Sequence, residues 1–276
     1  MPALPLILYA IIANITIEEM FVGGLLPALV MLIIAAWWGV VNQPAGKKQT
    51  GTGFNLKRAF SSLWVAKWEL LLPVVLFSGM FSGYMTPLEA SAVTAFYIFI
   101  IEVLIHRDLS LRTDVPRVLV QCGLLVGGIL LILGVALGLT NYMVDAQISD
   151  LAVDWVKQSI EKPWVFLLAL NAFLIMVGCF VDIFSAIVVI APLIVPIGLA
   201  FGIHPVHLGI VFLANMELGY LTPPVGMNLF FASSRFDQPI IKVCRSVAPL
   251  FAMLAIGLFV ITFVPWLSTG LLQLLN

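Results

Sequence analysis

The fold of this chain is decided by residues 215–228, which read Asn-Met-Glu-Leu-Gly-Tyr-Leu-Thr-Pro-Pro-Val-Gly-Met-Asn. They lie within an otherwise apolar stretch, 205–234, that is long enough to cross ~30 Å of hydrocarbon as a helix. Pro223 and Pro224 each lack a backbone N–H, and Pro223 also disfavours helical geometry at Thr222. The pattern therefore predicts a helix that breaks at 222–226.

A broken helix at membrane depth has a specific chemistry. Its first half ends in free carbonyl oxygens, which are ligands for Na⁺, and its second half begins with free amides, which favour an anion. The Thr222 hydroxyl and the Asn228 amide oxygen add two oxygen ligands, while Gly219 and Gly226 allow close approach of the backbone. A simple proline kink is the alternative. Because a kink needs only one proline, the sequence favours an ion site.

The composition indicates that lipid is the solvent of this protein. Of the 276 residues, 62% are hydrophobic and 10% are charged, far from the averages of soluble domains. So few charged side chains exclude a cytosolic enzyme, and a net charge of −1 excludes a nucleic-acid-binding protein. The sequence also holds no HExxH, GxSxG or P-loop motif. We expect neither an enzyme nor a bound cofactor.

Long apolar stretches predict the membrane crossings. They lie at 20–41, 70–88, 90–105, 118–144, 163–181, 183–203, 205–234 and 246–272. Their lengths suit helices and not the short alternating strands of a barrel, so the fold class is an all-α polytopic membrane protein.

Basic residues in the loops predict the orientation. Lys and Arg gather at 42–68, 106–117 and 235–245, which we place in the cytoplasm, whereas the opposite loops are acidic or uncharged. Alternation then places the C-terminus outside.

Two threadings of 163–203 satisfy this alternation. Either 163–181 and 183–203 are two full spans, or they are the arms of a re-entrant hairpin that turns back inside the membrane. Asp182 lies at the turn in both, with Gly178 before it and Ser185 after it. As a hairpin tip, Asp182 would meet the break at 222–226; after a full span, it would lie in cytoplasmic water. Glu217, one turn before the break, is a further candidate ion or proton ligand.

Residues 145–162 differ from the apolar stretches. Apolar and charged side chains fall on opposite faces of a helix here, which predicts an amphipathic arm along the membrane interface. An ordinary loop helix packed on its own protein is the alternative.

A weak internal repeat relates 2–37 to 224–259 at a constant offset of 222 residues. Acidic residues follow the start of the first copy and basic residues follow that of the second, which implies opposite orientations. Such an inverted repeat is the usual plan of secondary transporters.

Four motifs resemble the large membrane subunit (DctM-like) of tripartite ATP-independent periplasmic (TRAP) transporters. They are Gly-Tyr-Leu-Thr-Pro-Pro-Val-Gly-Met-Asn-Leu-Phe at 219–230, Phe-Val-Asp with Pro-Leu-Ile-Val-Pro at 180–196, His-Pro-Val-His-Leu-Gly at 204–209 and Ser-Gly-Tyr-Met-Thr-Pro-Leu-Glu-Ala at 82–90. The resemblance extends over essentially the whole chain.

The resemblance implies a Na⁺-coupled, elevator-type secondary transporter in the bacterial inner membrane, with its C-terminus in the periplasm. A periplasmic substrate-binding protein would deliver an organic acid such as a C4-dicarboxylate, and a small TRAP membrane subunit would complete the scaffold. The Na⁺ ligands would be oxygens at Gly178, Asp182, Gly219, Thr222 and Gly226. The neighbouring candidates for substrate contact are Ser185, Asn215, Pro223, Pro224 and Asn228.

The resemblance also assigns the segments. Residues 1–19 would end the broken helix of the first repeat, and 20–144 would be mainly scaffold and connecting helices. The arm is 145–162, the transport hairpin with its broken helix is 163–235, and the last transmembrane helix is 236–276. We expect the N-terminal part of the first repeat to be missing, either because the chain is a fragment or mis-started product or because another chain supplies it. The alternatives in function are an ion-coupled transporter of another inverted-repeat family and a structural subunit that does not transport.

Overall fold

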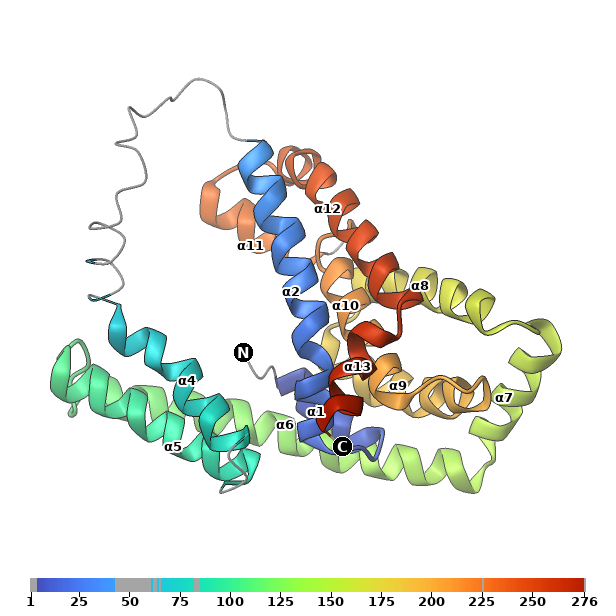
Figure 1. Cartoon of the computed structure of the whole chain (residues 1–276), viewed down its shortest axis with the longest axis horizontal. Coiled ribbons are helices and arrows are strands. Elements are labelled where there is room, and N and C mark those ends of the chain that lie inside the picture. Colours follow the sequence, from blue (N-terminus) through green and yellow to red (C-terminus); the bar gives the residue numbers. More distant parts are fainter. Residues whose placement is uncertain are drawn as a thin grey trace. The chain divides into compact units, whose positions relative to one another are not determined.

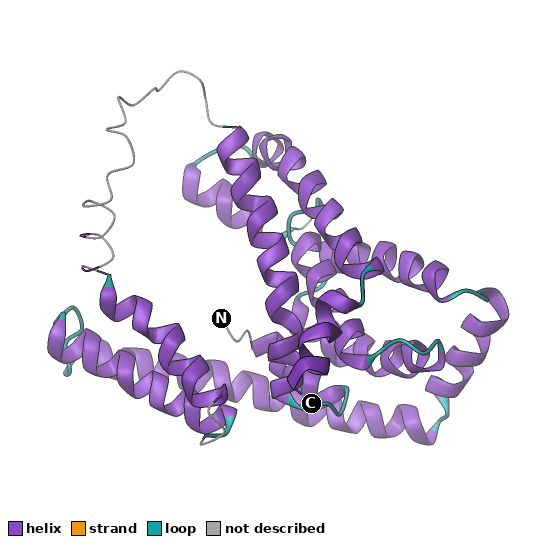
Figure 2. Ribbon diagram, viewed as in Figure 1, coloured by secondary structure: helices purple, strands orange, loops and turns teal. Residues whose placement is uncertain are grey.

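A computed structural model describes residues 4–42, 61, 64, 66–81, 85–224 and 226–275. These residues form helices joined by short turns, without strands (Figure 2). Within the described part of the chain, four helices are long and apolar enough to cross a membrane: Ile17–Val41, Pro163–Phe180, Ile183–Ala200 and Ile240–Phe263. The predicted all-α membrane architecture is confirmed at this level. The predicted cytoplasmic lysines and arginine at 47, 48, 57 and 58 lie outside the described residues, as does Val225 of the break.

The chain divides into two compact units, Pro44–Leu130 and the combination of Met1–Gln43 with Leu131–Asn276. The smaller unit contains α4 (Lys67–Phe81), α5 (Pro87–Ile100) and η1 (Ile101–Ile105), a π-helical turn that continues α5. The Tyr97 hydroxyl donates to the carbonyl of Trp68, which ties α5 to α4. Thr86 and Glu89 form a capping box at the start of α5, so Glu89 serves as a cap. Helix α6 (Asp114–Asp145) passes from this unit into the larger one.

The larger unit contains an antiparallel helical hairpin. Its arms, α8 (Pro163–Phe180) and α9 (Ile183–Ala200), are joined by Val181 and Asp182. At the open end of the hairpin, the ring of Phe166 stacks on that of Phe201 with 5.0 Å between centroids. Helix α10 (Pro205–Gly219) packs beside α8 and runs in the same direction. Its C-terminal end therefore reaches the turn of the hairpin. Helix α11 (Met227–Phe236) follows the break (Figure 1).

The helix boundaries agree with the predicted internal repeat. An offset of 222 residues carries α1 (Leu4–Ile12) onto 226–234, where α11 lies, and α2 (Ile17–Val41) onto 239–263, where α12 (Ile240–Phe263) lies. Helices α2 and α12 pack together and run in opposite directions (Figure 1). Each contains an internal proline, Pro27 and Pro249, at equivalent positions. An inverted pair of helices requires this arrangement, and the inverted repeat itself stays a prediction.

Buried side chains from α1, α2 and the hairpin surround α10. Tyr9, Met20 and Phe212 are completely buried, and the rings of Tyr9 and Phe212 lie 5.7 Å apart. The ring of Tyr9 lies directly against Gly209. Any side chain at 209 would occupy the space of that ring, so glycine is required for this contact. Helix α2 therefore packs with the hairpin-bearing unit. The predicted assignment of 20–144 mainly to a scaffold remains a prediction.

Two segments differ in detail from the elements that the sequence predicts. Helix α7 (Ile148–Ser159) packs on α9 through residues such as Ala152 and Val156 but leaves Leu151 and Trp155 exposed, so it has one packed and one free apolar edge. The last apolar stretch, predicted as one helix, is divided at Val264 and Pro265 into α12 and α13 (Trp266–Leu275). Pro265 lacks the N–H that a continuous helix would need at that point.

Candidate functional site

The structure confirms the predicted break in the helix. Helix α10 ends at Gly219, and the chain makes an irregular turn before α11 begins at Met227. The Thr222 hydroxyl donates to the carbonyl of Leu218 over 3.0 Å, and the Pro223–Pro224 peptide bond is cis. A Cβ atom at Gly226 would lie 2.7 Å from the Thr222 carbonyl oxygen and 3.0 Å from that of Tyr220. Glycine at 226 therefore allows the chain to pass directly against these two carbonyl groups.

Asp182 begins the second arm of the hairpin as the N-cap of α9. Its carboxylate accepts hydrogen bonds from the Ser185 amide at 3.0 Å and from the Ser185 hydroxyl at 2.5 Å. These contacts satisfy one of the free amides of the first turn. The two residues that the sequence placed at the turn are thus joined to one another. We use the name hairpin tip for residues 178–185.

The hairpin tip contacts the break directly. A Cβ atom at Gly219 would lie 2.5 Å from the Gly178 Cα, so the two backbones touch at a point where only glycine fits. The Ile183 N–H donates to the Tyr220 hydroxyl over 2.6 Å, which links the start of α9 to the residue after α10. The re-entrant threading predicts this contact between the turn and the break, while the depth of the turn in the membrane stays a prediction. Tyr220 was not predicted as a site residue, because nothing in its local sequence indicates a partner 37 positions away.

A chain of buried polar side chains fixes α10 to its neighbours. The Asn215 amide donates to the Asn171 Oδ1 on α8 and to the carbonyl of Val211. The Asn171 amide donates to the Thr262 hydroxyl on α12 over 3.1 Å. Both Asn215 and Thr262 are completely buried. Asn215, predicted to lie near substrate, therefore lies inside the helix packing.

His207 continues this polar chain. Its Nδ1 lies 2.6 Å from the Ser268 hydroxyl on α13, and its Nε2 lies 3.2 Å from the carbonyl of Thr262. Both ring nitrogens thus have protein partners. His204 instead caps α10, with its ring accepting from the Val206 amide. The two histidines consequently serve different structural roles.

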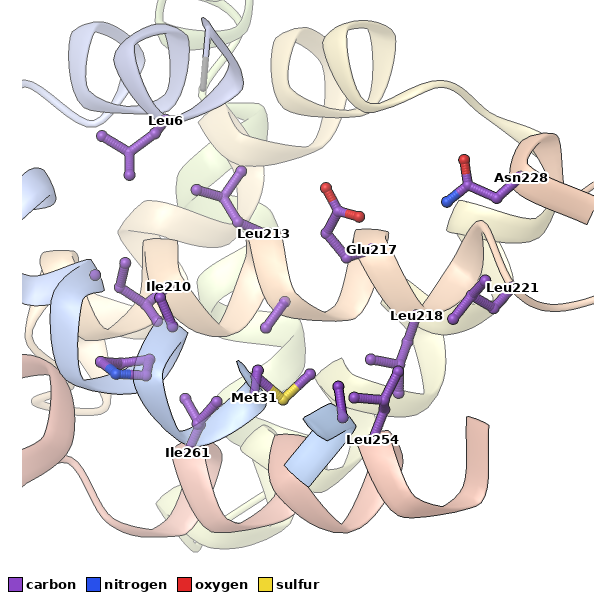
Figure 3. A pocket seen from close by; sticks show the side chains of 15 residues that line it. Leu6, Met31, Ile210, Leu213, Glu217, Leu218, Leu221, Asn228, Leu254 and Ile261 are labelled. Atoms are coloured by element: carbon purple, nitrogen blue, oxygen red, sulfur yellow. The ribbon is translucent and has the colours of Figure 1, made fainter. Parts of the chain in front are cut away.

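On another side of the break lies an open cavity of about 430 Å³. Its walls come from α1, α2, α10, α11 and α12, and they are aliphatic apart from the Glu217 carboxylate and the Asn228 amide (Figure 3). Figure 3 shows the Glu217 side chain on α10, before the break, and the Asn228 side chain on α11, after it. We refer to this space as the Glu217 cavity.

The structure places the predicted residues in different surroundings. The hairpin tip and the adjoining end of α10 contain Gly178, Asp182, Ser185, Gly219 and Thr222. Asn228 lines the Glu217 cavity, and Pro223 and Pro224 are exposed at the turn of the break. The backbone oxygens near Gly178 and Gly219 are of the type that holds Na⁺, and the start of α11 provides amides suited to an anion.

Fold and site together define a class: a polytopic helical membrane protein in which a helical hairpin meets a broken helix. A sequence profile of the family described as "Tripartite ATP-independent periplasmic transporter, DctM component" matches residues 2–267. The chain belongs to this family.

Several similar proteins are named as TRAP transporter permeases. The chain is 32% identical over 270 residues to the C4-dicarboxylate TRAP transporter large permease protein DctM of Pseudomonas aeruginosa, covering 98% of this chain and 63% of the relative. The corresponding protein of Vibrio cholerae is 33% identical over 298 residues, covering 99% and 65%. The isethionate TRAP transporter permease protein DctMQ of Oleidesulfovibrio alaskensis is 32% identical over 267 residues, covering 96% and 42%. The chain thus spans less than two thirds of the length of these relatives.

Proposed function

We propose that this chain is the C-terminal portion of the large permease subunit of a Na⁺-coupled TRAP transporter that imports organic acids across the bacterial inner membrane. The observation that carries the proposal is the contact between hairpin tip and broken helix, at Gly178 and Gly219. Helix α10 has 15 residues, or about 22 Å, and so falls short of the ~30 Å hydrocarbon core. A helix of this length that starts at one membrane surface ends at depth, which supports a position of the tip and the break inside the membrane.

Carbonyl oxygens at such a depth can bind a cation even where they accept a hydrogen bond. The carbonyls of Asp182 and Gly219 each accept a backbone N–H, and each keeps a second lone pair that a cation can use. We assign the Na⁺ ligands to oxygens at Gly178, Asp182, Gly219, Thr222 and Gly226. The Asp182 side chain is already engaged with Ser185, so backbone oxygens would supply most of the ligands.

The substrate class follows from chemistry and from the relatives. C4-dicarboxylates and isethionate, for which these three relatives are named, are organic anions. The free amides at the start of α11 favour an anion at the break. We retain Ser185, Pro223, Pro224 and Asn228 as candidates for substrate contact. Asn215, whose side chain is completely buried, is assigned a supporting role instead.

The same proposal includes the partners and the movement. A periplasmic binding protein would deliver the substrate and a small TRAP subunit would complete the scaffold. The hairpin and the broken helix lie wholly within one compact unit of the chain, which supports their movement as one body in an elevator mechanism. The C-terminus is assigned to the periplasm by the basic loops.

Transport measurements test the proposal. The permease that carries this chain is reconstituted in proteoliposomes with its small subunit and its binding protein, and uptake of a labelled C4-dicarboxylate is followed with and without an inward Na⁺ gradient. We expect uptake only with the gradient, and a strong loss when Thr222→Ala and Asn228→Ala are combined. Uptake that ignores the Na⁺ gradient contradicts the coupling. Uptake that survives the double substitution contradicts the role of the break and favours a purely structural subunit.

A further inference from the structure

Glu217 is the feature of the Glu217 cavity that the proposed function leaves unused. Among the residues that line this cavity, it is the one ionisable side chain, and the described residues make no ion pair with it. Its neighbours in the lining are aliphatic groups such as Leu213 and Leu221, with the Asn228 amide as the other polar side chain (Figure 3).

Helix geometry separates Glu217 from the hairpin tip. Residues two apart on an α-helix point in directions that differ by roughly 200°. Gly219 faces Gly178 on α8, and Asn215, one turn before it, faces Asn171 on the same helix. The Glu217 side chain therefore leaves α10 on the side opposite α8, and enters the cavity between α10 and α2.

Two sources of negative charge meet at this place. Glu217 lies in the last turn of α10, where the helix dipole already concentrates negative charge from the terminal carbonyls. More than a third of Glu217 is exposed to the open cavity, so water reaches its carboxylate, but the helix dipole still disfavours a negative charge at this end of α10. A bound cation compensates this repulsion.

We propose that Glu217 and Asn228 form a binding site for a monovalent metal cation, separate from the site at the hairpin tip. The Glu217 carboxylate provides charge and the Asn228 amide provides a neutral oxygen, both hard ligands suited to Na⁺ or K⁺. The cavity of about 430 Å³ is much larger than a bare ion, so water completes the coordination shell. The two ligands come from opposite sides of the break, so that the cation joins α10 to α11.

Carboxyl modification tests the site in the wild-type chain. The chain in lipid nanodiscs is treated with a hydrophobic carbodiimide in NaCl, KCl or choline chloride of equal ionic strength, and modification of Glu217 is followed by mass spectrometry. At a cation concentration near ten times its dissociation constant, the metal salt slows modification about ten-fold relative to choline. Exposed Asp154 on α7, measured in the same samples, is modified equally in the three salts. Comparing NaCl with KCl identifies the ion. Equal rates at Glu217 in all three salts overturn the proposal.

Variants separate this site from that at the hairpin tip. Cation binding at this site should raise the thermal midpoint of the wild-type chain. Glu217→Gln should lose that increase, while Asp154→Asn should keep it. In Gly219→Ala, which disturbs the tip contact, cation protection of Glu217 should persist. Protection that disappears in Gly219→Ala shows that the cation binds at the tip and overturns a separate site. Because protection is measured without transport, failure of Na⁺-dependent uptake leaves this result standing.

Discussion

The Asn215 amide nitrogen donates to the Asn171 Oδ1 over 2.5 Å, at the buried junction of α10 and α8. The next contacts along the same junction are those of Gly219 with Gly178. The asparagine pair therefore sets the register in which the hairpin tip reaches the end of α10. A polar contact among apolar helices has few competing partners, so it specifies one alignment where aliphatic side chains would accept several.

A double-mutant cycle tests this pair. Asn171→Ala, Asn215→Ala and their combination are compared by the free energy of unfolding in mixed micelles, and we expect a coupling energy of about 0.6–1.7 kcal/mol. Asn171→Ala combined with Ser246→Ala, an exposed residue of α12, is the control cycle and should be additive. Additivity of the two asparagine substitutions contradicts the register role.

The glycine contact predicts a steric effect. Gly219→Ala places a Cβ atom 2.5 Å from the Gly178 Cα, so the helices must separate, and we expect a loss of about 1–3 kcal/mol in unfolding free energy. Gly134→Ala on α6, whose added Cβ meets nothing within 4 Å, is the matched control. It should be neutral or stabilising by up to about 1 kcal/mol, because alanine favours helix. Similar losses in both variants would show that the contact is not tight.

The hydrogen bond to the Tyr220 hydroxyl should protect the Ile183 amide of the hairpin tip from hydrogen exchange. Tyr220→Phe removes the acceptor of the Ile183 N–H, at a cost of about 0.5–1.5 kcal/mol. Hydrogen exchange at Ile183 should then become faster by up to about ten-fold. Tyr142→Phe, at an exposed tyrosine on α6, should leave this exchange unchanged. Unchanged exchange at Ile183 in Tyr220→Phe would contradict the link between tip and break.

Asp182 predicts a difference between two substitutions. Asn is as good an N-cap as Asp, whereas Ala cannot accept the Ser185 amide, so Asp182→Ala should cost about 1 kcal/mol and Asp182→Asn little. If backbone oxygens hold Na⁺, Asp182→Asn also keeps Na⁺-dependent stabilisation, measured by the thermal midpoint. Loss of that stabilisation in Asp182→Asn would show that the carboxylate charge is itself a ligand.

The contact of buried His207 with Ser268 predicts that two neighbouring substitutions on α13 differ in their effect on unfolding free energy. Ser268→Ala leaves the His207 Nδ1 without its partner in a completely buried place, and we expect a loss of about 1–3 kcal/mol. Thr269→Ala, the next residue, removes a hydroxyl that bonds locally to the carbonyl of Pro265 and should cost less. Chemical denaturation of both variants in the same lipid checks the order. A larger loss in Thr269→Ala would contradict the role of His207.

The break in the helix and the turn at Asp182 could both be predicted from local sequence. Pro223 and Pro224 predicted the break because proline removes a backbone donor wherever it lies, and the structure ends α10 at Gly219 and begins α11 at Met227. Asp182 was recognised as a turn residue for a similarly local reason. Tyr220 and Asn171 were missed, because their roles depend on partners in other helices.

Charge and hydropathy along the chain determined that this protein is an all-helical membrane protein with an interrupted helix, since burial of the backbone in lipid allows few other structures. Packing decided what the sequence left open. It showed that the turn at Asp182 lies against the break, that Asn215 faces α8 and that Glu217 faces a cavity. Those outcomes depend on which faces of the helices meet, and in uniformly apolar helices the sequence pattern does not distinguish one face from another, so close contacts such as Gly178 with Gly219 make the choice.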